Sequence, residues 1–111
     1  MKSKICIFLA AYNGENYIGE QLQTILNQTH KPHKIHINID KSSDKTQPIV
    51  KEFAKTNPEI LILNSNKRFG SAAANFMYLL LNEDLAHMDY IAFSDQDDIW
   101  KEDKLEKAIH K

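Results

Sequence analysis

The chain has 111 residues, of which 42% are hydrophobic and 26% are charged, and its formal net charge is −1. This composition is typical of one globular domain with a single core, and it lacks the strongly basic character expected of a nucleic-acid-binding protein. No apolar run approaches the length of a membrane span, and the single cysteine, Cys6, allows no disulfide within the chain, as is typical of a reducing compartment.

The first third of the chain predicts a strand, a helix and a second strand. Residues 4–11 are almost continuously apolar, which is typical of a parallel strand covered on both faces. Residues 15–28 place their apolar side chains along one helical stripe, and this helix is expected to end before Pro32. Residues 34–39 alternate isoleucine with polar residues, which predicts the second strand.

The middle of the chain predicts two helices separated by a short strand. Asp44 and Gln47 have the spacing of a capping box and predict the start of a helix. Residues 60–63 predict a third strand. Residues 71–81 predict a third helix, whose apolar face would be formed by Phe76, Met77, Leu80 and Leu81.

The last part of the chain completes the alternation of strands and helices. Residues 90–94 predict a buried fourth strand, and a final helix is expected from about Trp100 onward. This order predicts an α/β fold, a Rossmann-like parallel sheet of about four strands with flanking helices. Ligands of such sheets bind at the carboxyl ends of the strands. The polar segments 12–14, 40–44 and 95–98 each follow a strand, so we expect them to meet at one edge.

The segment after the fourth strand is strongly acidic. Asp95, Asp97 and Asp98 place three carboxylates within four residues. Carboxylate oxygens suit hard cations such as Mg²⁺ and Mn²⁺, and a cation held by few carboxylates commonly takes its other ligands from phosphates. Helix capping by Asp97 or Asp98 is an alternative. The convergence of the three polar segments favours a metal–diphosphate site over capping.

Other nucleotide folds fit the sequence less well. The chain has only three glycines, Gly14, Gly19 and Gly70, and they form neither the dinucleotide-binding pattern nor a P-loop. A nucleotidyltransferase would need a glycine- and lysine-rich loop near the amino terminus, and the sequence has none there.

Four segments together resemble a known family. Residues 8–14, 25–29, 40–46 and 93–100 are similar, in sequence and in spacing, to the amino-terminal half of a family 2 glycosyltransferase of the GT-A fold. The Asp-Gln-Asp-Asp-Ile-Trp sequence resembles the rhamnosyltransferase-like branch of that family. The resemblance covers nearly the whole chain.

The resemblance implies a donor nucleotide site. Ala11, Tyr12 and Asn13 match the loop that lines the nucleobase and ribose. Asp40 matches the aspartate that accepts a hydrogen bond from the pyrimidine N3–H, a role that suits a carboxylate. The family usually has a second aspartate directly before this one, and the chain has Ile39 there. For Tyr12, core packing remains an alternative.

The resemblance also implies the metal ligands. Asp97 would bind Mn²⁺ or Mg²⁺ bridging the donor diphosphate, and Asp95 would contact both the metal and the ribose. The family tends to have an arginine where this chain has Ala74. Arg68 or Lys67 would replace it as a phosphate contact, although Arg68 has the alternative of a solvated loop charge. For Trp100, packing is favoured over donor contact.

The activity implied is transfer of a sugar, with inversion, from a UDP- or dTDP-sugar to a saccharide or lipid-linked acceptor. The expected setting is bacterial surface polysaccharide synthesis in the cytoplasm, at the cytoplasmic face of the membrane, with any membrane association through parts outside this chain. Residues 1–111 would be the donor-binding part, without the acceptor-binding half. The catalytic base is expected outside the chain, so that the chain alone would be inactive.

The alternative is a non-catalytic module that binds nucleotide or serves only in oligomerisation. The apolar face left by the absent half could then be covered in a homodimer.

Overall fold

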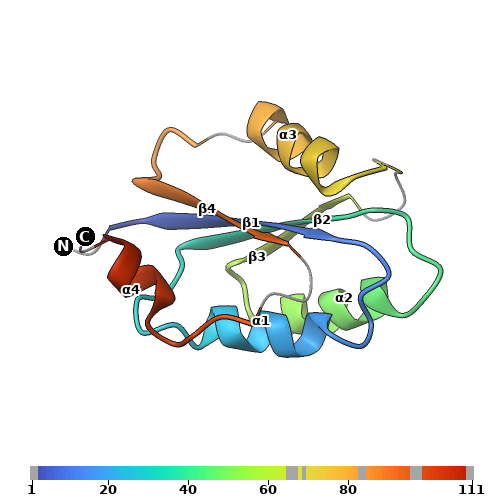
Figure 1. Cartoon of the computed structure of the whole chain (residues 1–111), viewed down its shortest axis with the longest axis horizontal. Helices are drawn as coiled ribbons and strands as arrows, with labels where there is room; N and C mark the ends of the chain where they lie inside the picture. The colour runs from blue at the N-terminus through green and yellow to red at the C-terminus, as the bar shows by residue number, and fades with distance from the viewer. Residues whose placement is uncertain (1–2, 65–67, 69, 83–84, 96–98, 110–111) are drawn as a thin grey trace.

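The computed structural model describes residues 3–64, 68, 70–82, 85–95 and 99–109, and these form one parallel sheet with helices on both faces (Figure 1). The strand order is β3-β2-β1-β4. This confirms the predicted Rossmann-like fold. The elements are β1 Ile5–Ala11, α1 Ile18–Leu26, β2 Lys34–Ile39, α2 Thr46–Thr56, β3 Ile60–Asn64, α3 Ala72–Asn82, β4 Tyr90–Asp95 and α4 Lys104–Ile109.

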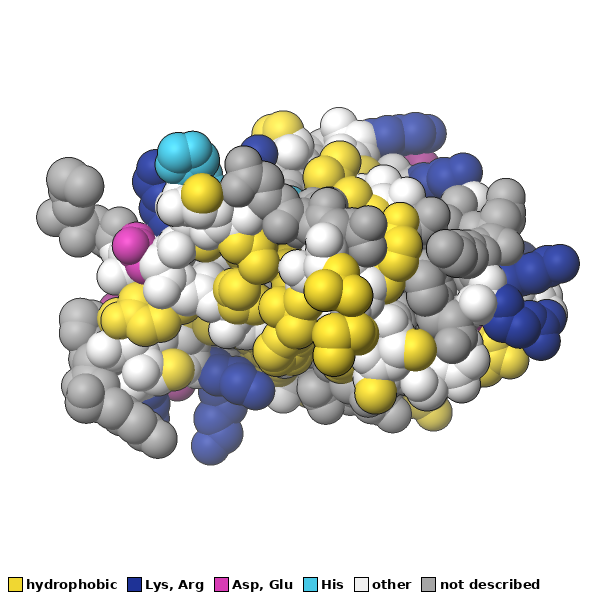
Figure 2. Space-filling view, turned by 90° about the horizontal axis from the view of Figure 1, so that it is seen from above, with side chains coloured by type: hydrophobic (Ala, Val, Ile, Leu, Met, Phe, Trp, Pro, Cys, Tyr) yellow, Lys and Arg dark blue, Asp and Glu magenta, His cyan; other side chains and the backbone are white. Residues whose placement is uncertain are grey.

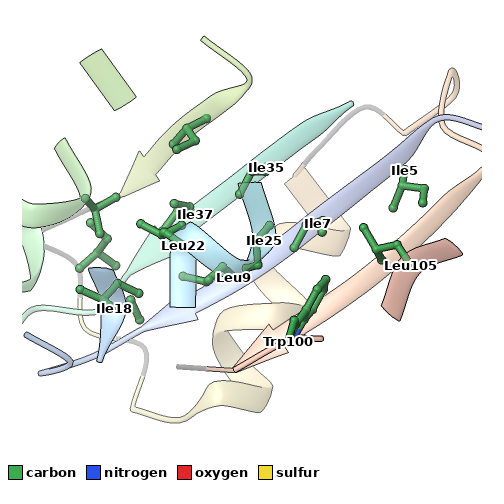
Figure 3. Close-up of a cluster of buried hydrophobic side chains, with 14 residues drawn as sticks. Ile5, Ile7, Leu9, Ile18, Leu22, Ile25, Ile35, Ile37, Trp100 and Leu105 are labelled. Carbon is green, nitrogen blue, oxygen red and sulfur yellow. The ribbon is translucent and has the colours of Figure 1, made fainter. Parts of the chain in front are cut away.

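The central strand β1 is buried along its whole length because helices cover both of its faces. Its odd-numbered residues face α1, α2 and α4, where Leu9 packs with Leu22 and Ile37 in the larger hydrophobic cluster (Figures 1 and 3). Its even-numbered residues face α3, where Phe8 packs with Leu79 in the smaller cluster. The nearly continuous apolar sequence of this strand is thereby explained.

Two predicted helices begin later than the sequence indicated. The last helix starts at Lys104 rather than at Trp100, whose side chain is instead buried in the larger cluster. α2 starts at Thr46 with Lys45 at its N-cap, so the predicted cap at Asp44 is one residue early. Asp44 Oδ1 accepts from the N–H of Thr46, two residues on, because the chain makes a side-chain-stabilised turn before the helix.

α1 is also shorter than the predicted span 15–28. The backbone N–H groups of Tyr17 and Ile18 both donate to the carbonyl oxygen of Gly14, which forms a turn ahead of the helix. The helix ends at Leu26, well before Pro32. No helix within the described ranges is long and apolar enough to cross a membrane.

The buried face of α3 differs from the predicted one. Leu79 and Asn75 are buried, whereas Met77 and Leu81 are 54% and 76% exposed. α3 is apolar on most of its circumference, so hydrophobic periodicity alone could not select the face that docks on the sheet. Figure 2 shows hydrophobic side chains gathered at the centre of this side of the molecule. The exposed apolar residues of α3 are Met77, Leu80 and Leu81, and Leu61, Ile91 and Phe93 are exposed on the sheet face that α3 covers. The predicted burial of the fourth strand is thus wrong for Ile91 and Phe93. Homodimer formation through these residues stays a prediction.

Candidate functional site

The carboxyl ends of the strands bring three predicted site residues to one edge of the sheet. In the strand register, Ala10 pairs with Asp95 and Ala11 pairs with Ile39. The N–H of Asp40 then donates to the carbonyl oxygen of Ala11 at 2.8 Å. The ends of β1, β2 and β4 are therefore neighbours, as the sequence predicted.

Asn13 holds the loop after β1 against the loop after β2. Its side-chain Oδ1 accepts a hydrogen bond from the N–H of Ser43 at 2.8 Å. Its backbone N–H donates to Ser42 Oγ at 3.0 Å. Asn13 has a φ of 44°, in the left-handed region that asparagine tolerates better than most residues. Its carboxamide oxygen is thus used in building the loop, a role that the sequence did not reveal.

Asp44 makes a second link between the same two loops. Its Oδ2 accepts from the N–H of Glu15 at 3.1 Å, and its Oδ1 accepts from the hydroxyl of Thr46 at 2.6 Å. The same hydroxyl oxygen, Thr46 Oγ1, accepts from the N–H of Gly14 at 2.7 Å. Partial desolvation would raise the pKa of Asp44, but the hydrogen bonds from the Thr46 side chain and from backbone N–H groups outweigh it and lower the pKa.

Tyr12 and Arg68 are exposed at this edge. The Tyr12 side chain is 51% exposed, so the alternative of core packing is wrong for this residue. An exposed aromatic ring offers a face on which a base can stack. Arg68 is exposed in the connection between β3 and α3, which is compatible with both a phosphate contact and a solvated charge.

Asp40 is buried and ties the end of β2 to the start of α3. Its Oδ2 accepts from the N–H of Gly70 at 3.0 Å, and its Oδ1 accepts from the N–H of Lys41 at 2.9 Å. A second link joins the same two elements, because Asn75 Nδ2 donates to the carbonyl oxygen of Asn38 at 3.1 Å. Both carboxylate oxygens of Asp40 thus accept from backbone N–H groups, which fixes the orientation of the carboxylate.

The predicted metal ligands are only partly within the described structure. Asp95 is the last residue of β4, which places its backbone at the shared edge. Asp97 and Asp98 lie outside the described residues. Among the side chains that the structure does describe, no group of three potential ligands could hold a metal ion. The metal site therefore stays a prediction.

Both flanks of the acidic segment are described, and both contact α1. Gln21 Nε2 donates to Ser94 Oγ at 2.8 Å before the segment, and the N–H of Trp100 donates to Thr24 Oγ1 at 3.2 Å after it. Trp100 is buried, which confirms packing as its role. The sequence analysis missed Gln21 and Thr24; the available signal was polar residues at helical spacing within a buried stripe.

The structure is a parallel α/β sheet whose polar residues gather at the carboxyl edge of its strands. Residues 6–111 match the family model described as glycosyl transferase family 2, and the chain belongs to this family. The resemblance stated from the sequence is therefore confirmed.

Curated relatives include bacterial sugar transferases. The chain is 47% identical over 102 residues to the dTDP-rhamnosyl transferase RfbG of Shigella flexneri, covering 91% of this chain and 35% of the relative. It is 32% identical over 108 residues to the putative teichuronic acid biosynthesis glycosyltransferase TuaG of Bacillus subtilis, covering 97% and 41%. The chain thus spans less than half the length of these relatives.

Solved structures with the same fold include glycosyltransferases of the GT-A type. TarS 1-349 of S. aureus superposes with a TM-score of 0.80 at 22% identity, covering 96% of this chain and 31% of TarS. The mannosyltransferase PcManGT of Pyrobaculum calidifontis, solved with GDP-Man and Mn²⁺, superposes with a TM-score of 0.78 at 23% identity, covering 98% and 32%. These likenesses establish the fold.

Proposed function

We propose that the protein transfers a sugar from a dTDP- or UDP-sugar to the hydroxyl of a saccharide or lipid-linked acceptor, with inversion. Its setting is bacterial surface polysaccharide synthesis at the cytoplasmic face of the membrane. The observation that carries the proposal is the register that places Ala11, Asp40 and Asp95 side by side at the carboxyl edge of the sheet, in a chain of this family.

In this proposal, two groups recognise the nucleoside. The exposed ring of Tyr12 stacks on the base or ribose beside Ala11 and Asn13. Asp40 accepts a hydrogen bond from the pyrimidine N3–H, and its position is fixed by the N–H groups of Gly70 and Lys41. A carboxylate held in this way loses little freedom when the base binds. The dTDP-rhamnosyl function of the Shigella relative supports a dTDP-sugar as the first donor to examine.

The carboxylates of Asp95 and Asp97 are proposed to hold Mn²⁺ or Mg²⁺, with Arg68 close to the phosphates. The residues present fit a hard cation, since the donor set consists of carboxylate oxygens at the carboxyl end of β4, which pairs with β1 beside the proposed nucleotide loop. The bound Mn²⁺ of PcManGT supports this choice. The metal would neutralise charge on the leaving nucleoside diphosphate.

Residues 1–111 are proposed to form the donor-binding part of a longer catalytic domain. The relatives are more than twice as long as the matched region, and we assign the acceptor site and the catalytic base to the part that this chain lacks. In an inverting transferase that base takes the proton of the acceptor hydroxyl. The 111-residue chain should therefore bind donor nucleotide and transfer no sugar.

Calorimetric titration of the chain with dTDP, UDP and GDP, each in Mn²⁺ and in EDTA, tests the proposal. We expect metal-dependent binding of a pyrimidine nucleotide that Asp97→Asn abolishes. Asp89→Asn is the matched control, because Asp89 lies at the opposite end of β4, where its carboxylate accepts from the N–H of Lys4. A folded chain that binds none of the three nucleotides, or binds them equally well in EDTA, would contradict the proposed site.

A further inference from the structure

A row of three polar side chains in α1 and just after it faces the end of β4 and the residues that follow the acidic segment. Gln21, Thr24 and Gln28 are spaced by three and four residues, so they lie along one side of the helix and its carboxyl end. Gln21 and Gln28 are buried, and Thr24 is half-buried. Buried polar side chains need hydrogen-bond partners, and all three find theirs more than 70 residues away.

The first member of the row fixes the chain just before the acidic segment. Gln21 Nε2 donates to Ser94 Oγ at 2.8 Å, and both side chains are 0% exposed. Ser94 directly precedes Asp95, so this bond fixes the residue immediately before the first carboxylate of the acidic segment. A bond between two fully buried groups is protected from competition by water and is costly to break.

The other two members fix the chain just after the acidic segment. Thr24 Oγ1 accepts from the N–H of Trp100 at 3.2 Å. Gln28 Nε2 donates to the carbonyl oxygen of Lys101 at 2.7 Å, and Gln28 Oε1 accepts from the N–H of Leu105 at 3.0 Å. Residues 99–103 therefore run alongside α1, on the same side of the sheet (Figure 1).

The row is internally connected as well. Thr24 Oγ1 donates to the carbonyl oxygen of Gln21 at 2.8 Å, and Gln28 Nε2 also donates to the carbonyl oxygen of Thr24 at 3.1 Å. Ser94 and Trp100 are thus both hydrogen-bonded to side chains of the same helix, α1. Fixing both ends of a short segment to one rigid element reduces the conformational freedom that the segment loses when it binds a ligand.

We propose that Gln21, Thr24 and Gln28 are positioning residues that fix Ser94, Trp100 and Lys101, on the described flanks of the acidic segment, for the binding of a divalent cation carrying a nucleoside diphosphate. The inference rests on the proposed donor site. These side chains act through Ser94, Trp100 and Lys101, and they contact no ligand themselves. Apolar residues at these positions would leave the N–H groups of Trp100 and Leu105 and the carbonyl oxygen of Lys101 without these partners.

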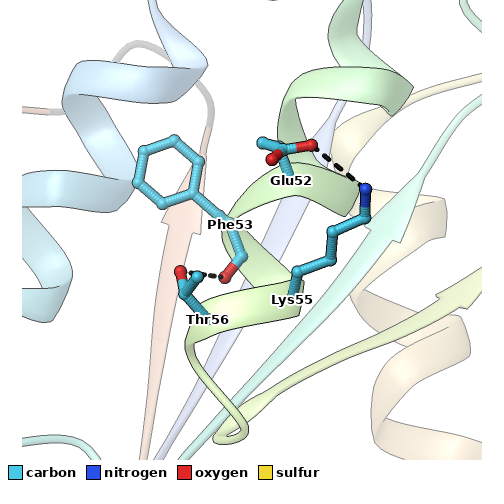
Figure 4. A network of polar contacts seen from close by, with 4 residues as sticks. All are labelled: Glu52, Phe53, Lys55 and Thr56. Atoms are coloured by element: carbon cyan, nitrogen blue, oxygen red, sulfur yellow. Dashed lines mark hydrogen bonds and ion pairs between the residues drawn. The ribbon is translucent and has the colours of Figure 1, made fainter.

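Thr24 offers the sharpest test, because two substitutions separate its hydroxyl from its shape. Thr24→Val keeps the branched shape and removes the acceptor of the Trp100 N–H, whereas Thr24→Ser keeps the oxygen. Thr56→Val is the matched control: Thr56 lies at the end of α2, where its hydroxyl donates to the carbonyl oxygen of Phe53 (Figure 4). The readout is the ratio of the dTDP dissociation constant in EDTA to that in Mn²⁺, measured by calorimetry on the folded chain.

We expect Thr24→Val to lower this ratio by about tenfold while the dissociation constant in EDTA stays within about twofold of the wild-type value. Thr24→Ser and Thr56→Val should leave the ratio unchanged. An unchanged ratio in Thr24→Val, or equal weakening in both buffers, would overturn the positioning role. A wild-type ratio of one would overturn the metal part of the proposed function itself, and the inference with it.

Ser94→Ala supplies a second variant if Thr24→Val does not fold. It removes the oxygen that receives the Gln21 bond and changes little else in shape. The same drop in the metal-dependent ratio is expected, and an unchanged ratio in folded Ser94→Ala would overturn the proposal. Circular dichroism and thermal unfolding establish that each variant is folded before the titration.

Discussion

Asp40 accepts a hydrogen bond from the N–H of Gly70, at 3.0 Å from its Oδ2, although the two residues lie thirty positions apart. This bond joins the residue proposed to read the pyrimidine base to a glycine two residues before α3. Gly70 has a φ of 88°, a conformation that side chains with a Cβ rarely adopt. The hydrogen bond of the Asp40 carboxylate therefore depends on a backbone conformation that favours glycine.

Asp40→Asn should weaken pyrimidine nucleotide binding by about tenfold or more, because an amide nitrogen cannot accept from N3–H. It should also lower the free energy of unfolding by about 1–2 kcal/mol, since one of the two backbone N–H donors loses its acceptor. Calorimetry and urea unfolding measure the two effects. Asp103→Asn, which removes only an exposed partner of Lys107, is the control, and equal binding loss in both variants would contradict the assignment.

Alanine substitutions at Gly70 and at Gly19 should change the free energy of unfolding in opposite directions. Gly70→Ala meets no atom within 4 Å, so its expected cost of about 1–2 kcal/mol is purely one of backbone strain. Gly19→Ala lies in α1, where the new Cβ would contact the Phe53 ring at 3.8 Å, and it should stabilise the chain by about 0.5–1 kcal/mol. Urea unfolding of both variants tests this, and destabilisation by Gly19→Ala would show that this helix position does not tolerate a side chain.

The contribution of Asp44 to stability should depend on pH. The folded-state pKa of Asp44 lies below the ordinary value of an aspartate, because its hydrogen bonds outweigh its desolvation. Its stabilising effect is therefore fully present above that ordinary value and is lost as the pH falls through the lower folded pKa. Asp44→Asn should therefore destabilise the chain at pH 7 and at pH 5, and the difference from wild type should shrink towards pH 3. Thermal or urea unfolding at the three pH values measures it. A difference that does not change with pH would show that the charge is not what stabilises the loop.

Gln28→Leu should destabilise the chain by about 2–4 kcal/mol, because Lys101 loses a donor and Leu105 loses an acceptor in a buried setting. Gln23→Leu is the matched control, since Gln23 is exposed on the same helix and its replacement should change stability by no more than about 0.5 kcal/mol. Urea unfolding followed by the fluorescence of Trp100, the single tryptophan, reports both. Equal effects of the two substitutions would mean that the buried bonds of Gln28 add nothing.

The sequence by itself determined the class of fold and the edge of the sheet at which the polar segments meet. Continuous apolar residues in β1 indicated a strand covered on both faces, and the isoleucines of β2 alternated because one face meets the main core. The order of strands and helices then implied parallel pairing, which places all carboxyl ends together. These features are local in sequence, and hydrophobic periodicity reports them directly.

Only the tertiary structure decided which side chains hold that edge together. Periodicity misplaced the docking face of α3, because Met77 and Leu81 are as apolar as the buried Leu79. It also gave no partner for Asn13, which bonds Ser43, or for Gln21, which bonds Ser94 across 73 residues. A hydrogen bond needs donor and acceptor within about 3 Å in a suitable direction. That condition is set by strand register and helix placement, which act over the whole chain and leave no local pattern in the sequence.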